Sequence, residues 1–388
     1  MEKKSKYRDF IDYSYIILML LTSGSVFYFV NLSAAIAYSV FFVLSFLLFA
    51  KRNNGVRFGK MGYYVPIFIF IVLVNRFIFN PNVTNNIWLA LIIGGLGSFF
   101  FYSSFGFIRF RELLLNSVAI LTIISIIVCV LDMLRILPVS YVNIGGSDQT
   151  MFLCFCVGRG GHFDRMASIW HEPGACQIIL NSVLFLYIPL IKQRAASRGQ
   201  IRKLLIIATG VIFTQSTTGL IILLFIAVLM MQRNNDKNIG RRVLSLTLAV
   251  VFIALFMGSD IIQEKFDEEN TESSFIIRRQ ENIACLTMAL EKPLVGYGIA
   301  TKEFYDKSLN LDNLNSSNGL LQFAAFLGFL WLLIYLISAG STIKKMNLQS
   351  STFLLIILFV LLQSNEAFVE YPISYLFVCR FKNYISIG

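Results

Sequence analysis

Residues with the chemistry for proton transfer stand together just before Pro173. This proline suits the first turn of a helix, so Glu172 is expected at the helix N-terminus, where the helix dipole favours a carboxylate. A carboxylate or an imidazole within hydrogen-bond reach of a hydroxyl group can accept its proton. We therefore predict Glu172 as a catalytic base, with His171 as its substitute. The alternative is that Glu172 only caps the helix, because acidic residues are common in first helical turns.

Arginines in two separate segments have the chemistry for binding phosphate. Arg165 lies in the first segment, and Arg278 and Arg279 lie in the second, on a predicted helix that ends before Pro293. The planar guanidinium group donates two parallel hydrogen bonds to phosphate oxygens. We predict that these arginines, together with Arg159, bind phosphate groups. The alternative for Arg278 and Arg279 is that they reach lipid head groups instead.

The composition shows what kind of scaffold must position these residues. Of the 388 residues, 56% are hydrophobic and only 14% are charged, which is more apolar surface than a soluble domain can hide. A hydrocarbon core about 30 Å thick needs roughly 20 apolar residues per helix. The apolar runs predict an all-α, polytopic membrane bundle with about twelve crossings. The predicted spans are 12–31, 33–50, 62–80, 87–107, 113–137, 174–191, 243–258 and 319–339, with 204–231 and 352–379 as hairpins.

The net charge of +11 is interpreted as a signal of membrane topology. Clusters of Lys and Arg recur with an even number of predicted crossings between them, which predicts that the clusters and both chain termini are cytoplasmic. Most Asp and Glu residues fall in two long loops, 138–173 and 259–318, which then face outward from a single membrane domain, 1–388. These loops are the predicted site of any water-facing chemistry, and nucleic-acid binding is not expected.

Cysteines and acidic residues predict neither a disulfide framework nor a metal centre. The six cysteines are scattered, and Cys154 and Cys156 are too close in sequence to bridge easily. The acidic run at 267–269 is interpreted as a solvated turn. We therefore expect no metal and no cofactor.

The hairpin at 204–231 is predicted to be too short to cross a membrane twice. Each arm of about 14 residues covers about 21 Å, less than the hydrocarbon thickness. The turn at 214–219 is polar, and its hydroxyl groups can satisfy backbone groups where water is scarce. We predict that this turn lies below the outer surface and forms the floor of a pocket. The alternatives are a single bent helix or an ordinary hairpin tip.

The sequence Val295-Gly296-Tyr297-Gly298 copies most of a potassium-channel filter. Such a filter needs four copies around an axis and two flanking helices. Here the sequence follows Pro293 in a long acidic loop, so we predict a glycine turn instead of a pore.

Taken in order along the chain, the motifs resemble the Wzy-type polysaccharide repeat-unit polymerases and the related O-antigen ligases. The likeness covers most of residues 150–335. The motifs are Arg165 followed by Glu172-Pro173, a short helix pair around Ser216-Thr217-Thr218-Gly219, Arg278 or Arg279 before Pro293-Leu294-Val295-Gly296-Tyr297-Gly298, and Asn318 at the start of the next helix.

This resemblance implies a GT-C-like glycosyltransferase of the bacterial plasma (inner) membrane. It would join oligosaccharide units carried on undecaprenyl pyrophosphate at the outer face, without nucleotide sugar or metal. Membrane lipids surround it, and a chain-length regulator and a flippase are implied as partners. The arginines named above would bind the pyrophosphate, and the pocket lining would include His162, Ser216, Thr217, Thr218, Tyr297 and Asn318.

Two other functions compete with polymerisation. One is ligase-type transfer of glycan to an acceptor, although Ser317 stands where relatives often have a His before the Asn. The other is a lipid-linked oligosaccharide flippase or another transporter, which would place ionisable groups in the middle of helices. In this sequence Arg76, Asp132 and Arg135 lie near predicted helix ends, which favours an enzyme.

Overall fold

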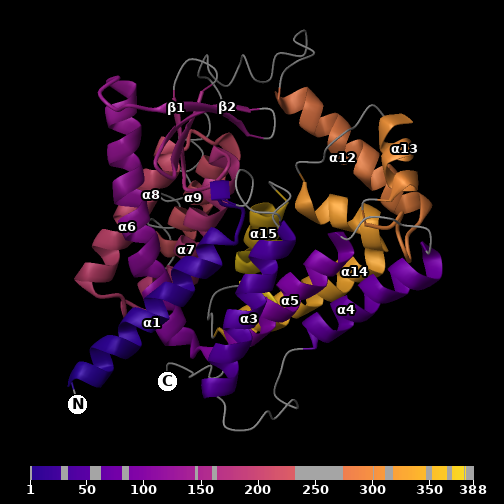
Figure 1. Cartoon of the computed structure of the whole chain (residues 1–388), viewed down its shortest axis with the longest axis horizontal. Helices are drawn as coiled ribbons and strands as arrows, with labels where there is room; N and C mark the ends of the chain where they lie inside the picture. The colour runs from indigo at the N-terminus through magenta and orange to yellow at the C-terminus, as the bar shows by residue number, and fades with distance from the viewer. Residues whose placement is uncertain are drawn as a thin grey trace, which may run out of the picture.

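The computed structural model is dominated by helices of the kind that a membrane requires (Figure 1). A helix satisfies all its backbone hydrogen bonds internally, which lipid tails cannot do for it. The residues that the structure describes are 2–27, 34–52, 63–80, 87–144, 147–159, 164–231, 274–299, 301–310, 318–346, 352–364, 369–379 and 381.

Five of the described helices are long and apolar enough to cross a membrane, which confirms a polytopic membrane protein. Their apolar windows are 35–52, 87–104, 107–133, 173–192 and 319–345. The predicted total of about twelve crossings stays a prediction, because the span at 243–258 lies outside the described residues. The helices of the bundle are α1 (Glu2–Leu21), α3 (Ala34–Arg52), α4 (Tyr64–Val74), α5 (Ile87–Ser104), α6 (Phe107–Met133), α7 (Pro173–Lys192), α8 (Arg198–Phe213), α9 (Thr217–Met231), α14 (Gly319–Lys345) and α15 (Thr352–Gln363), and α4 continues into the π-helix η2 (Asn75–Phe79).

Helix α7 lies at the centre of one half of the bundle. Every residue from Pro173 to Leu190 is buried, and α6, α8, α9 and α15 all pack against it. The predicted hairpin at 204–231 is confirmed, because α8 and α9 run as an antiparallel pair joined at residues 214–216. Since both arms pack on α7, the turn is fixed relative to the start of α7.

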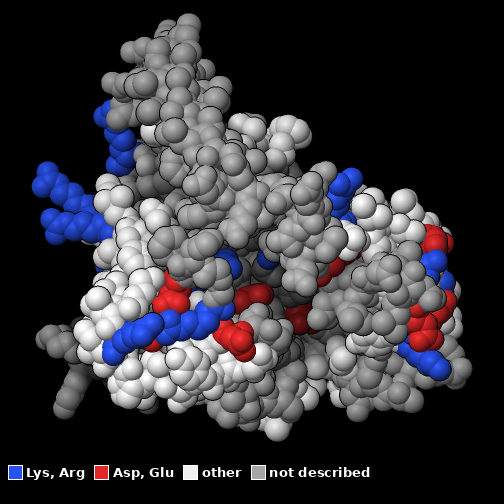
Figure 2. Space-filling model, turned by 90° about the horizontal axis from the view of Figure 1, so that it is seen from above, with Lys and Arg blue, Asp and Glu red and all other residues white. Residues whose placement is uncertain are grey.

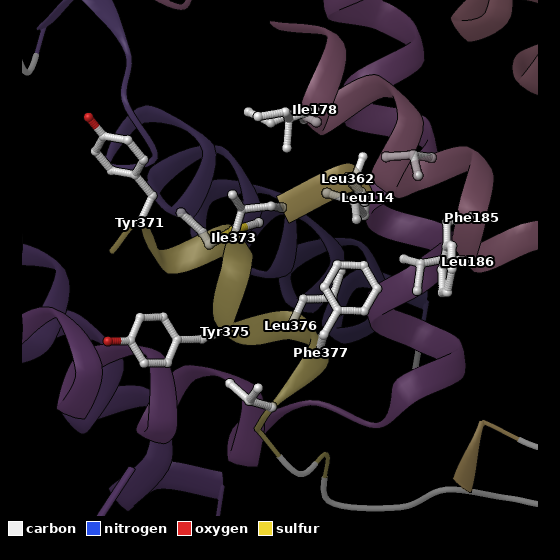
Figure 3. Packing of buried hydrophobic residues seen from close by; sticks show 14 of the residues in the cluster. Leu114, Ile178, Phe185, Leu186, Leu362, Tyr371, Ile373, Tyr375, Leu376 and Phe377 are labelled. Carbon is white, nitrogen blue, oxygen red and sulfur yellow. The ribbon is translucent and has the colours of Figure 1, made fainter. Parts of the chain in front are cut away.

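The second predicted hairpin, 352–379, is only half correct. Its first arm is α15, but the second arm is a short 3-10 helix, η3 (Pro372–Phe377), instead of a membrane-crossing helix. Every residue of η3 is buried, and the ring centroids of Phe377 and Phe185 of α7 are 5.4 Å apart. Both side chains are labelled in Figure 3. The residues of η3 looked like part of a span because most of them are apolar, although they are buried inside the bundle.

The two ends of the bundle differ in what they carry (Figure 1). The end with the N-terminus, called here the basic end, holds a cluster in which Arg52 and Arg109 pair with Asp9 and Asp12 of α1. The opposite end, called here the loop end, carries a β-sheet and the helices α12 (Ser274–Glu291) and α13 (Lys302–Asn310). The described parts of both long loops therefore lie at the same end of the bundle.

The prediction of an all-α fold is wrong for the first loop. Four strands between Ser140 and Ser168 form an antiparallel sheet in the order β1-β2-β3-β4. The strands are β1 (Ser140–Ile144), β2 (Ser147–Phe152), β3 (Phe155–Gly158) and β4 (Arg165–Ser168). Such short strands carry too few alternating residues to be distinguished from a loop. The sheet packs through β3 and β4 against α6 and α7.

The glycine turn after α12 is confirmed, and the structure shows what it binds. Gly328 interrupts α14 with a φ of 83°, and the exposed backbone of α14 pairs with the turn. The amide of Tyr297 donates to the carbonyl of Ala325 at 2.8 Å, and the amide of Phe329 donates to the carbonyl of Pro293 at 2.6 Å. The glycine motif thus joins the second loop to a break in a long helix.

Candidate functional site

Glu172 and His171 form a close pair at the start of α7. Pro173 is the first residue of the helix, as predicted, and Glu172 takes the N-cap position. Its side chain makes no capping hydrogen bond, so the cap alternative does not describe what the carboxylate does. Instead, Oε1 of Glu172 lies 3.2 Å from Nε2 of His171.

The surroundings of His171 assign a role to each ring nitrogen. Nδ1 lies 3.0 Å from the carbonyl oxygen of Gly24, which can only accept, so Nδ1 must carry a proton. Nε2 then faces the Glu172 carboxylate, and that contact is favourable only when one proton lies between the two groups. The His171 amide also donates to Gly24, and the His171 carbonyl accepts from Gln149 Nε2. The pair is therefore held from several sides.

Arg165 connects the first loop to the turn of the α8–α9 hairpin. Its Nε donates to the carbonyl of Thr214 at 3.3 Å, and Gln215 Nε2 donates to the carbonyl of Asp164 at 3.3 Å. Sequence reasoning predicted that both Arg165 and this turn belong to one site, and the structure brings them into contact. The depth of the turn in a membrane stays a prediction.

Residues of the turn itself have structural roles as well. Ser216 is buried, and its Oγ accepts from the amide of Gly219 at 3.3 Å, which caps α9. Gly219 approaches α7 so closely that an added Cβ would lie 2.9 Å from Cβ of Gln177. Thr217 and Thr218 are half-buried at the same turn. Their predicted place in the pocket lining stays a prediction.

A buried carboxylate that sequence reasoning did not select holds Arg159. Asp132, at the end of α6, is 2% exposed and receives two 3.0 Å hydrogen bonds from Nη2 of Arg159. Thr150 Oγ1 donates to the same carboxylate at 2.7 Å, and Asp164 pairs with Arg159 from the other side. Because two carboxylates already engage Arg159, pyrophosphate would have to compete for it.

The predicted residues of the second loop are placed on α12 and α14. Arg278 and Arg279 are exposed on α12, which packs mainly on α14. Asn318 caps α14, because its Oδ1 accepts from the amide of Leu321 at 3.1 Å. Convergence of the α12 arginines with Arg165 stays a prediction, and His162 lies outside the described residues.

Tyr297, also predicted to line the pocket, is buried in a small cluster between α12, α13 and α14. Its hydroxyl donates to the Glu291 carboxylate. Burial, and then this hydrogen bond, raise the pKa of Tyr297 to about 12. Packing alone accounts for its position, and a role toward a ligand stays a prediction.

Glu370 is a further carboxyl group that the sequence reasoning did not select. It lies in the connection between α15 and η3, outside the apolar helices, and burial raises its pKa to about 7. The nearby amide of Ile373 donates to Oγ of Ser23 at 3.1 Å, and Ser23 precedes the residue that holds His171. The signal in the sequence was a carboxylate within an otherwise apolar stretch.

The loop end seen from above shows where charge gathers (Figure 2). Acidic and basic side chains surround a recessed centre, and a second mixed group lies at one edge. Within the described ranges, His, Cys, Asp and Glu form no group of three that could hold a metal ion. These side chains include guanidinium groups, which are suited to binding an anion, and a carboxylate beside an imidazole, which are suited to accepting a proton from a hydroxyl group.

The comparison with protein families identifies one segment. Residues 204–336, about a third of the chain, match the family model described as O-antigen ligase. The match runs from the α8–α9 hairpin into α14 and includes α12 and its glycine turn. No curated protein and no solved structure matches the chain. Over residues 204–336 the chain is thus similar to the O-antigen ligase family.

Proposed function

We propose that this chain polymerises oligosaccharide repeat units carried on undecaprenyl pyrophosphate into surface polysaccharide. It would act as a glycosyltransferase at the outer face of the bacterial plasma membrane. The observation that carries the proposal is the contact of Arg165 with the turn of the family-matched hairpin. The Glu172–His171 pair follows on the same segment and opens α7, against which the hairpin packs.

The proposed reaction is one displacement at the anomeric carbon of the donor sugar. The acceptor hydroxyl oxygen forms a bond to that carbon while the bond from the carbon to the diphosphate oxygen breaks, and the carrier diphosphate leaves with the bonding electrons. Arg165, with Arg278 and Arg279, would bind the leaving group more tightly as its negative charge develops. A single displacement inverts the anomeric centre.

The acceptor proton would pass to Glu172. As the hydroxyl oxygen attacks, its proton moves to the carboxylate, and His171 Nε2 shares that proton at 3.2 Å. The hydrogen bond from Nδ1 to Gly24 keeps the imidazole turned toward the carboxylate. Because the donor is already activated by its diphosphate, the reaction needs no nucleotide sugar.

The proposal also implies partners and a cellular location. A flippase must deliver the carrier-linked substrate to the outer face, and a chain-length regulator would limit the product. With the loop end outward, the N- and C-termini would be cytoplasmic.

A ligase would use the same donor and the same chemistry, and would differ only in its acceptor. A transporter fits the structure less well, because Asp132 and Arg76 lie at helix ends with local partners. Arg76 donates to the carbonyl of Asn80 at 3.0 Å, and Asp132 binds Arg159 and Thr150.

Replacement of the proposed base tests the proposal most directly. In a deletion strain complemented with Glu172→Gln, we expect surface polymer formation to fall by about 10²–10⁴-fold, as loss of a general base implies. Asp306→Asn is the matched control, because Asp306 is an exposed carboxylate on α13 at the same end. A gel ladder of surface polysaccharide is the measurement. Unchanged polymer from Glu172→Gln would refute the assignment of the base.

The same gel separates the competing functions. The deletion strain is compared with the complemented strain. If loss of the protein leaves single repeat units on the cell surface, the protein is a polymerase. If loss leaves long chains attached to the carrier it is a ligase, and if loss leaves repeat units inside the cell it is a transporter. Arg165→Ala, Arg278→Ala and Arg279→Ala should each reduce polymer. Arg198→Ala, an exposed arginine at the start of α8, should not. Normal polymer from the three loop variants would refute the pyrophosphate site.

A further inference from the structure

A cleft at the loop end, with both polar and apolar walls, has no part in the proposed displacement. It has a volume of about 910 Å³ and lies between the end of α6 and the β1–β2 hairpin. That volume is within the range of about 300–1,000 Å³ that is usual for small-molecule sites. The residues that matter for its chemistry are Asp132, Tyr141, Asn143, Asp148, Gln149 and Arg159.

The lining combines groups that donate and groups that accept hydrogen bonds. Carboxylates accept, guanidinium groups donate, and amides do both. The two carboxylates of Asp132 and Asp148 are balanced by the guanidinium groups of Arg135 and Arg159, which also line the cleft. A ligand with many neutral hydroxyl groups matches such a set, because each hydroxyl both donates and accepts.

An exposed aromatic ring completes the match to a sugar. Tyr141 is 81% exposed on β1 and lines the cleft. A tyrosine ring offers an apolar face together with a polar hydroxyl group, which suits a ligand with one apolar and one polar side. A sugar ring has such a character, with C–H groups on its faces and hydroxyl groups at its edge.

Two buried polar atoms in the cleft walls have hydrogen-bonding capacity to spare. Gln149 is 1% exposed, and although its Nε2 donates to the His171 carbonyl, its Oε1 has no hydrogen-bond partner. Nε of Arg159 is likewise buried without a partner.

The cleft is joined to the proposed catalytic pair through one side chain. Gln149 lines the cleft and also binds the backbone of His171, the residue before Glu172. A saccharide in the cleft would therefore lie on the side of the site where the acceptor hydroxyl loses its proton. A diphosphate fits the cleft poorly, because Asp132 and Asp148 would repel it and Arg159 is already paired with two carboxylates.

We propose that this cleft is an acceptor-side saccharide subsite, which binds neutral sugar units of the acceptor glycan beyond the reacting one. The term acceptor-side rests on the proposed function, whereas saccharide binding by the cleft does not. The subsite would select the acceptor by its second and later sugars. It would also hold a growing glycan while its reacting end is positioned.

Binding measured on the full chain in detergent tests the proposal. The probe is the repeat-unit oligosaccharide released from the surface polysaccharide of the source strain, without carrier or diphosphate. We expect Tyr141→Ala and Asp148→Asn each to raise its Kd by at least about tenfold, or about 1.4 kcal/mol. Tyr305→Ala, a 47% exposed tyrosine on α13, is the control and should leave the Kd within about twofold. Isothermal titration calorimetry gives the constants.

The arms of the experiment separate this subsite from the catalytic proposal. Glu172→Gln should bind the oligosaccharide normally while polymer is lost. Unchanged affinity in Tyr141→Ala and Asp148→Asn would overturn the subsite and leave the proposed function standing. Weaker binding in those variants, with normal polymer from Glu172→Gln, would keep the subsite and refute the catalytic base. A diphosphate-bearing probe whose affinity depends on Asp148 more than that of the neutral probe would also overturn the subsite.

Discussion

The first and second loops use their charged residues in opposite ways. In the first loop, Arg159 and the His171–Glu172 pair contact groups from several elements, including Asp132 at the end of α6, and a cleft opens beside them. In the second loop, two ion pairs on the surface join α13 to the end of α12 and to Lys292, which follows it. Lys292 Nζ lies 2.5 Å from Glu303 Oε1, and Lys307 Nζ lies 2.7 Å from Glu291 Oε1.

This difference suggests that one loop carries reactive groups and that the other has a structural role. Exposed ion pairs stabilise a fold little, because water and salt screen them. Buried pairs cost much to break, so they persist only where the surrounding structure holds them in place. The second loop depends instead on the backbone pairing between its glycine turn and α14. We infer that the first loop carries the proton chemistry. We also infer that the backbone hydrogen bonds between the glycine turn and α14 position the arginines of the second loop.

The largest expected effect is therefore on the backbone hydrogen bonds between the glycine turn at 293–298 and α14. Gly296 has a φ of 64°, and an added Cβ would lie 2.4 Å from the backbone carbon and oxygen of Phe326. Gly296→Ala combines a left-handed backbone with overpacking, so we expect a loss of about 2–6 kcal/mol and a low yield of folded protein. Thermal melting in detergent and folded yield are the measurements.

Gly106→Ala is the matched control for this substitution. Gly106 is the N-cap residue of α6, and an added Cβ there would meet nothing within 4 Å. Its melting temperature should stay close to that of the unsubstituted chain. If Gly296→Ala melted normally too, the close contact between the glycine turn and α14 would not be important for stability.

The next largest effect is expected at the end of α6, where Asp132 holds Arg159 of the first loop. Asp132→Asn weakens the two hydrogen bonds from Arg159 and leaves a guanidinium group with a single carboxylate partner, Asp164. We expect a loss of about 1–4 kcal/mol, because a buried charge loses its partner. Glu303→Gln, which removes an exposed pair on α13, should cost far less. Equal melting temperatures for the two variants would show that the buried ion pair of Arg159 contributes no more to stability than the exposed pair of Glu303.

The elements that sequence reasoning found were those with strong local signals. Pro173 marked the start of α7, Pro293 the end of α12, and Asn318 the cap of α14. Each signal acts within a few residues, through the fixed φ of proline or a side-chain bond to a nearby amide. Arg165 and the hairpin turn were predicted to belong to one site, but the hydrogen bond between Arg165 and Thr214 was not predicted.

The contacts that were missed join residues far apart in sequence. Asp132 and Arg159 meet only because the sheet folds back over the end of α6. Nothing in the local sequence of α14 shows that Gly328 interrupts the helix, since the partner that stabilises the break is the turn at 293–298. Gln149 joins the cleft to His171 through the antiparallel sheet, whose strands were too short to be predicted.

A smaller effect is expected for the pH dependence of stability near the first loop. Burial raises the pKa of Glu370 to about 7 from an ordinary value of 4.5. The folded chain therefore holds a proton that the unfolded chain releases, so stability falls as the pH rises from about 4.5 to about 7. Glu370→Gln removes this slope and should be more stable than the unsubstituted chain at pH 8 by about 1–3 kcal/mol.

Melting temperatures of both chains in detergent between pH 4 and pH 9 are the measurement. Parallel curves would show that Glu370 ionises alike in the folded and unfolded chains. The expected result is that the two curves meet at low pH and separate toward high pH.

The smallest effect is expected at Glu291, and its sign is the opposite. Hydrogen bonds from Lys307 and then from Tyr297 lower the pKa of Glu291. The carboxylate therefore adds stability that is present above about pH 4.5 and lost as the pH falls through the lowered pKa. Because Glu291 is exposed and Gln can still accept from both partners, Glu291→Gln should melt normally at pH 7 and make normal polymer. If this variant melted normally but made no polymer, a second-loop carboxylate would be doing the proton chemistry. The second loop would then carry the proton chemistry, and Glu291, which accepts a hydrogen bond from the Tyr297 hydroxyl, would replace Glu172 as the candidate base.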